Sequence, residues 1–104
     1  MIFHLTDSAR WAQSVSAGEH TGSSRGVELA DEGFIHCSTA VQWPATVERF
    51  YADAADLLLL HIDESLLTAP LVFEQLGEAP EPFPHLYGPL NLDAVVRVQQ
   101  IRPA

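Results

Sequence analysis

The longest apolar run of the chain, Leu57 to Leu60, continues after one histidine into Ile62 and is closed by Asp63. Such a run is typical of a strand buried on both faces, because a strand with one wet face alternates apolar and polar residues. It is far shorter than the roughly 20 residues that a membrane-spanning helix needs. We therefore predict a central strand over residues 57–62, against which the rest of the chain packs.

The flanking sequence predicts an α+β fold of short strands with two or three helices. Ile2–Thr6 is expected to be a strand that ends at Asp7, a good N-cap for a helix terminated by Gly18. Thr39 and Gln42 form a capping-box pattern for a second helix. The buried stripe of that second helix is expected to comprise Val47, Phe50 and Tyr51.

Further strands are expected over residues 34–38, 71–75 and 93–101, with the last strand inside the sheet. Residues 20–25 are small and polar, so they predict an exposed loop in which His20 meets solvent. Residues 77–89 hold four of the seven prolines and predict an ordered loop without regular structure. A chain of 104 residues has room for one core, so we expect a single domain over residues 1–104.

The charge balance excludes several classes of partner. Fourteen acidic residues face five basic ones, all of them arginine, which gives a formal net charge of -9. Phosphate backbones and anionic membranes both attract clusters of Lys and Arg, so we expect neither nucleic acid nor membrane as a partner. The single cysteine, Cys37, rules out an internal disulfide, and no metal-binding spacing is present. We expect a cytoplasmic bacterial protein, either a monomer or a weak homodimer, that needs no metal.

Strand alternation groups the polar residues into one candidate site. His4 and Thr6 share a strand face, as do His36 and Ser38, and each pair lies just before a predicted helix. Thr39 follows the second pair. Because helix N-termini attract anions, the pattern predicts a cleft that binds a small anionic metabolite.

The proline-rich segment adds His85 and Tyr87 to this site. So many rigid residues favour an ordered segment, and we expect His85 and Tyr87 to wall the cleft opposite His4 and His36. In the alternative interpretation, Tyr87 and Phe83 only seal one end of the core. The histidines themselves could likewise be hydrogen-bonded structural residues.

Two stretches, GFIHCST at Gly33 to Thr39 and EPFPHLYGPL at Glu81 to Leu90, resemble the signature of a bacterial family called domain of unknown function 952. The resemblance covers nearly the whole chain. It implies an ADP-ribosyltransferase-like α+β fold, in which small mixed or antiparallel sheets with two or three helices surround a cleft. In relatives of that fold the cleft holds NAD.

The order His-x-Thr, helix, loop, Ile-His-x-Ser is also similar to the start of RNA 2′-phosphotransferases and related ADP-ribosyltransferases. By that resemblance His4 and Thr6 would contact the ribose next to nicotinamide. His36, followed by Ser38 and Thr39, would match a second strand that positions the ligand. The chain lacks the arginines and the basic lobe of the phosphotransferases.

ADP-ribosyltransferases also use a glutamate late in the fold, and Glu74 is the candidate here. The resemblance thus implies NAD as the ligand, or no cofactor at all. If the chain is an enzyme, it would transfer an ADP-ribose or phosphate group, with His36 and His85 as hydrogen-bonding or acid–base groups and Glu74 as the carboxylate. The alternatives are a ligand sensor without catalysis and a protein-interaction domain with an exposed apolar patch around Phe83 and Tyr87.

Overall fold

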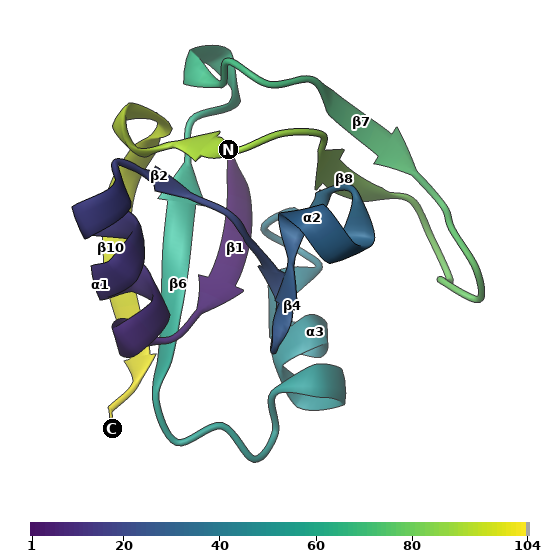
Figure 1. Ribbon diagram of the computed structural model, residues 1–104. Coiled ribbons are helices and arrows are strands. Elements are labelled where there is room, and N and C mark those ends of the chain that lie inside the picture. Colours follow the sequence, from purple (N-terminus) through teal and green to yellow (C-terminus); the bar gives the residue numbers. More distant parts are fainter. Residues whose placement is uncertain (104) are drawn as a thin grey trace.

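A computed structural model describes residues 1–103 as a mixed α+β fold of antiparallel sheets and three α-helices (Figure 1). The first half of the chain contains β1 (Ile2–Thr6), α1 (Ser8–Ala17), β2 (Glu19–His20), β3 (Gly22–Ser24), β4 (Val27–Glu28), α2 (Leu29–Glu32), β5 (Ile35–His36) and α3 (Trp43–Phe50). The second half contains β6 (Leu57–Ile62), β7 (Leu71–Glu74), β8 (Phe83–Leu86), β9 (Leu90–Asn91) and β10 (Val95–Arg102), with 3₁₀ turns at Glu64–Leu66 and Leu92–Ala94. Within residues 1–103, no helix is long and apolar enough to cross a membrane.

The first sheet has the order β1-β6-β10 and confirms β6 as its central strand. Both faces of β6 are covered. Leu60 and Ile62 pack on one face against residues that include Ile35 and Cys37, whereas Leu57 and Leu59 pack on the other face beside α3. The strand predicted at residues 93–101 is β10, but it lies at the edge of the sheet, because β1 occupies the other side of β6.

The second sheet has the order β5-β8-β7, and its central strand lies inside the proline-rich segment. The prediction that residues 77–89 contain no regular structure is therefore wrong. Pro84 has no N–H to donate, but its carbonyl accepts from Cys37 N at 3.0 Å, just beyond the last register pair of β5 and β8. The proline therefore lies where the pairing of β5 with β8 ends, and on the other side of β8 it is the register partner of Phe73.

Strand β1 also joins the two sheets. Its Phe3 exchanges two backbone hydrogen bonds with Ser38, each 2.8 Å long, while the opposite edge of β1 pairs with β6. The segment that follows β5 is therefore attached directly to the first sheet. Residues from both sheets meet at this junction.

Local signals place both longer helices. Asp7 caps α1 by accepting from the N–H of Arg10, and Gly18 ends this helix with φ of 85°. Thr39 and Gln42 exchange the expected reciprocal bonds of 3.0 and 3.3 Å, yet these close a turn and α3 begins only at Trp43. In α3, Val47 and the adjoining Tyr51 are buried as predicted, whereas Phe50 is 60% exposed, contrary to the prediction.

The exposed loop predicted at residues 20–25 is wrong. The segment forms β2 and β3, and β2 pairs with β9. His20 is 0% exposed, and Ser23 is also buried. These polar side chains are buried because each finds a hydrogen-bond partner inside the protein, and those partners lie outside the segment itself.

Leu60→Ala tests the role of β6 as the centre of the core. Leu60 is 0% exposed, so truncation removes buried surface and leaves a cavity, which should lower the free energy of unfolding by about 3 kcal/mol. Val98→Ala on β10, where the side chain is 43% exposed, is the matched control and should cost less than about 1 kcal/mol. Urea denaturation of both variants makes the comparison, and equal losses would contradict the assignment.

Candidate functional site

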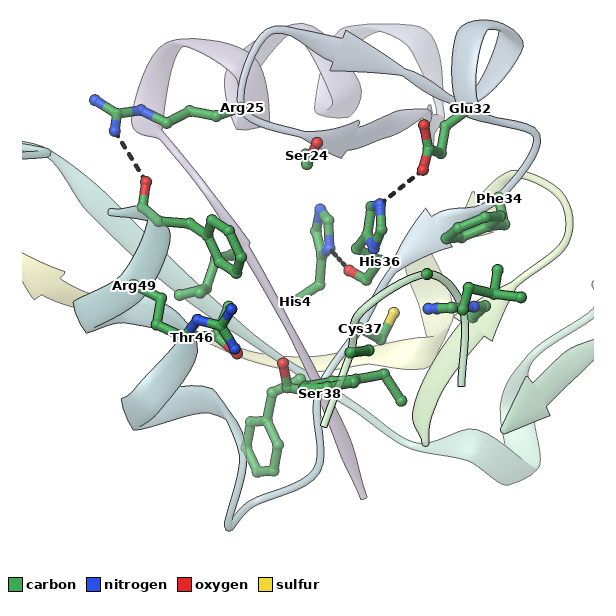
Figure 2. A pocket seen from close by; sticks show the side chains of 18 of the residues that line it. His4, Ser24, Arg25, Glu32, Phe34, His36, Cys37, Ser38, Thr46 and Arg49 are labelled. Carbon is green, nitrogen blue, oxygen red and sulfur yellow. Dashed lines mark hydrogen bonds and ion pairs between the residues drawn. The ribbon is translucent and has the colours of Figure 1, made fainter. Parts of the chain in front are cut away.

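A pocket of about 700 Å³ opens at the junction of the two sheets, and we call it the main pocket (Figure 2). Its wall is formed by β1, the β3–β4 turn, α2, β5, α3 and the β7–β8 connection. Five of the eight predicted site residues line it: His4, His36, Ser38, Glu74 and His85. The fold therefore gathers most of the predicted polar cluster around one cavity.

The other predicted site residues lie elsewhere. Thr6 lines a smaller neighbouring pocket of about 350 Å³, which also borders His4. Thr39 lines neither pocket, because its side chain bonds to Gln42 in the turn before α3. Tyr87 also lines neither pocket, but its hydroxyl donates to Glu74 and so supports the wall indirectly.

Glu74 is oriented by two neighbours. One carboxylate oxygen, Oε1, bonds to Nδ1 of His85 at 2.9 Å and to the hydroxyl of Tyr87. The Tyr87 hydroxyl, and then the His85 ring, hold the pKa of Glu74 below its ordinary value. Among residues 1–103, no hydrogen bond to the second oxygen, Oε2, is found. Glu74 is thus an ionised carboxylate with one oxygen available to a ligand.

His36 and His85 lie side by side, and the expectation that His85 faces His36 across the cleft is wrong. They are register partners on β5 and β8, with ring centroids 5.4 Å apart, and Phe34 stacks on His85 at 4.0 Å. Nε2 of His36 bonds to Glu32 at 3.1 Å. Burial lowers the pKa of His36, although the Glu32 carboxylate offsets part of this effect.

His4 uses both ring nitrogens within the protein. Nδ1 lies 2.6 Å from the backbone carbonyl of His36, a contact visible in Figure 2, and Nε2 lies 3.1 Å from Nε2 of His20. Burial lowers the pKa of His4 to about 4 and that of His20 to about 3, so both rings are neutral at pH 7. A ligand could reach a ring nitrogen of His4 only by displacing one of these partners.

Arginines, and not helix N-termini, provide positive charge at the pocket. The Asp7 carboxylate already occupies the N-terminus of α1, and the first residues of α3 do not line the pocket. Arg25 lines it but pairs with Asp53 at 2.6 Å. Arg49 lies over the ring of Phe50, and it takes part in no salt bridge among the described residues.

Sequence reasoning missed Arg49 and the aromatic part of the wall. Phe34, Phe50 and Phe83 line the pocket together with Arg49. Arg49 belongs to no motif, and the helical spacing of Phe50 resembles that of a core residue, so only the exposed end of α3 reveals their position. Ser24 and Tyr51 also line the pocket. Ser24 was missed because its segment was predicted to be an exposed loop, and Tyr51 because it was assigned to the buried stripe of the second helix.

Neither a metal site nor a reactive thiol is built into the described residues. Within residues 1–103, no group of three or more His, Cys, Asp and Glu side chains is arranged to hold a metal ion. Burial raises the pKa of the Cys37 thiol to about 12, which keeps it protonated. The chemistry available to the pocket therefore comes from a carboxylate, imidazoles, hydroxyls and a guanidinium.

Residues 5–98 match the family described as Protein of unknown function (DUF952). The chain belongs to this family. It is similar to the crystal structure of protein CC0527 from Caulobacter crescentus, with 33% identity and a TM-score of 0.81 over 95% of this chain and 83% of that chain. The solution NMR structure of CC0527 gives 28% identity and a TM-score of 0.78 over 97% and 84% of the two chains. No curated protein matches the sequence. The resemblance to the DUF952 family seen in the two sequence stretches is confirmed, and it comes with no assigned activity.

The buried histidines predict how the stability of this DUF952 protein depends on pH. The folded pKa values of about 4 and about 3 lie below the ordinary 6.5, so the unfolded chain binds protons first. Stability is full above about pH 6.5 and falls as the pH drops, by up to about 1.4 kcal/mol per pH unit for each histidine. Urea denaturation between pH 7.5 and pH 5, above the range in which carboxylates titrate, should show this slope.

His20→Gln removes one of the two titrating rings and keeps an N–H donor at the same place. Its slope between pH 6 and pH 5 should be smaller than that of the wild type by up to about 1.4 kcal/mol per pH unit. Equal slopes in the two proteins would show that His20 does not stay neutral in the folded state.

Proposed function

We propose that the main pocket of this DUF952 protein binds NAD, ADP-ribose or a similar small anionic metabolite, with Glu74 and Arg49 as its principal polar contacts. The observation that carries this proposal is the position of Glu74, whose carboxylate is oriented by His85 and Tyr87 at the edge of the cavity. A volume of about 700 Å³ also lies within the usual range for small-molecule sites.

The chemistry of the wall suits a ligand that carries hydroxyls, phosphates and an aromatic ring. Oε2 of Glu74 can accept from a ribose hydroxyl, and the guanidinium of Arg49 can bind a phosphate. Phe34, Phe50 and Phe83 provide apolar surface for a heterocyclic base or for nicotinamide. A net charge of -9 disfavours large polyanions but leaves room for one small anion beside a single arginine.

The sequence resemblance to ADP-ribosyltransferases and RNA 2′-phosphotransferases leads to the same ligand class. In this proposal Glu74 would correspond to the late glutamate and His36 to the second motif, and both residues line the main pocket. His4 departs from the expected ligand contact, because both of its nitrogens bond within the protein. In this proposal His4 shapes the wall, while His36 and Ser38 provide the side chains that face the ligand.

If the protein transfers ADP-ribose, the Glu74 carboxylate would lie beside the ribose that carries nicotinamide. When the bond between ribose C1 and the nicotinamide nitrogen breaks, nicotinamide leaves with the bonding electron pair, and an acceptor hydroxyl forms the new bond to C1. Glu74 would stabilise the positive charge that develops on the sugar and accept the proton of that hydroxyl. A ligand sensor would use the same contacts without bond cleavage, and an assay for released nicotinamide separates the two forms of the proposal.

Titration with NAD, ADP-ribose and nicotinamide, followed by NMR, tests the pocket. We expect saturable shifts of signals from His36, Ser38 and His85 with ADP-ribose. Glu74→Gln should weaken binding by at least about tenfold, because a hydrogen bond to a charged group contributes roughly 1.5–3 kcal/mol. Glu48→Gln removes the same charge from an exposed site on α3 outside the pocket and should bind like the wild type. The proposal fails if no signal near the pocket moves at millimolar ligand.

Arg49→Gln tests the phosphate contact separately. Loss of the charge-assisted bond should weaken ADP-ribose binding by about fivefold and leave the affinity for neutral nicotinamide unchanged. Arg97→Gln on β10, away from the pocket, is the matched control. Isothermal titration calorimetry measures both ligands, and an equal effect of the two substitutions would rule out a specific contact of Arg49.

A further inference from the structure

A chain of buried hydrogen bonds runs behind the wall of the main pocket. From α1 to β5 it connects Ser14, His20, His4 and the backbone of His36. Ser14 and His20 are each 0% exposed, and His4 is 3% exposed. The three bonds measure 2.6, 3.1 and 2.6 Å in that order. His20 lines neither of the two pockets, so the proposed ligand contacts leave its role open.

The carbonyl of His36 fixes the direction of every bond in this chain. A carbonyl oxygen only accepts, so Nδ1 of His4 must carry the hydrogen that is donated to it. In a neutral His4 ring, Nε2 is then an acceptor, and Nε2 of His20 must donate to it. The remaining nitrogen of His20, Nδ1, is an acceptor in turn, and the hydroxyl of Ser14 must donate to it. One arrangement of hydrogens satisfies the whole chain, with opposite tautomers on the two histidines.

The far end of the chain is anchored by an arginine. Arg10 donates to Ser14 Oγ at 3.0 Å and is itself held by Glu28 through bonds of 2.7 and 3.2 Å. Gly22 leaves space for this arrangement, since a Cβ there would lie 3.0 Å from Nε2 of His20. Ser14 and His20 are thus held by charged and packed neighbours, and neither side chain can turn without losing a buried bond.

We propose that His20 is a positioning residue. Its Nε2–H donates a hydrogen bond to Nε2 of His4 and so holds the His4 ring against the carbonyl of His36. The His4 ring in turn holds the backbone of His36 in place. The side chain of His36 lines the main pocket beside His85, so a shift of this backbone would change the pocket wall. The hydrogen-bond assignment stands independently of the ligand, whereas its effect on affinity rests on the proposed function.

Nitrogen NMR of the histidine side chains tests the assignment directly. We expect His4 to carry its hydrogen on Nδ1 and His20 on Nε2, and we expect a scalar coupling across the N–H···N bond between the two Nε2 atoms. Such a coupling arises only where the hydrogen is shared between those two nitrogens, so burial or packing alone does not produce it. A hydrogen on Nε2 of His4, or the absence of the coupling at neutral pH, would overturn the proposal.

A matched pair of substitutions tests the positioning role. His20→Gln keeps an N–H that can donate to His4, so the His4 signals should remain single and ADP-ribose should bind within about threefold of the wild type. His20→Leu removes the donor, so we expect exchange-broadened His4 signals and roughly tenfold weaker binding, because a displaced wall misorients the ligand. His61→Leu, on β6 beside the strand that carries His4 but outside both pockets, is the control.

The outcomes separate the two proposals. Unchanged His4 signals and unchanged binding in His20→Leu would overturn the positioning role. If the wild type shows the His20–His4 coupling but binds no ADP-ribose, the hydrogen-bond chain stands and the proposed function fails. The coupling is measured on the unmodified protein, so the assignment is decided even if His20→Leu does not fold.

Discussion

The structure depends on the double attachment of β1. One edge of this strand pairs with the central strand β6, and the other edge exchanges two backbone hydrogen bonds with Ser38 through Phe3. The next residue, His4, adds a side-chain bond to the carbonyl of His36. These contacts join two consecutive residues of β1, Phe3 and His4, to the segment from His36 to Ser38, and so hold the second sheet against the first. The main pocket lies where they meet, so its shape follows from the same bonds that hold the fold together.

Burial divides the polar residues of this region into two groups with different roles. His4 and His20 are kept neutral behind the wall, and their nitrogens are all used within the protein. Glu74 is kept ionised at the wall, with one oxygen available. A cluster that looks uniform in the sequence therefore consists partly of buried scaffold residues and partly of pocket-wall residues. The proposed function assigns the ligand to the second group, with Arg49 beside it.

Local signals in the sequence were enough for those parts of the fold that depend on local energetics. The apolar run at Leu57 to Leu60 and the capping residues Asp7 and Gly18 predicted β6 and α1, because burial and backbone geometry act on neighbouring residues. The sequence also predicted that His4, His36 and His85 line one cleft, although it placed His85 on the wrong side of that cleft. Alternation within a strand defines a face, but it does not reveal which strands are neighbours.

The incorrect predictions from the sequence have a common physical cause. A polar segment such as residues 20–25 is predicted to be exposed unless its partners are known, and Ser14 and His4 become partners of His20 only through the tertiary fold. Pro84 was excluded from a strand because the end of the β5 ladder cannot be seen in the sequence. Phe50 follows a buried spacing, yet α3 ends there and leaves its ring at the pocket.

The most direct test of the account is a crystal structure of the protein grown with ADP-ribose. We predict that the ligand occupies the main pocket with a hydroxyl within about 3.2 Å of Oε2 of Glu74, and that His4 keeps its bonds to His36 and His20. A ligand bound elsewhere, or one that contacts His4 after displacing His20 and leaves Glu74 without a bond, would contradict it.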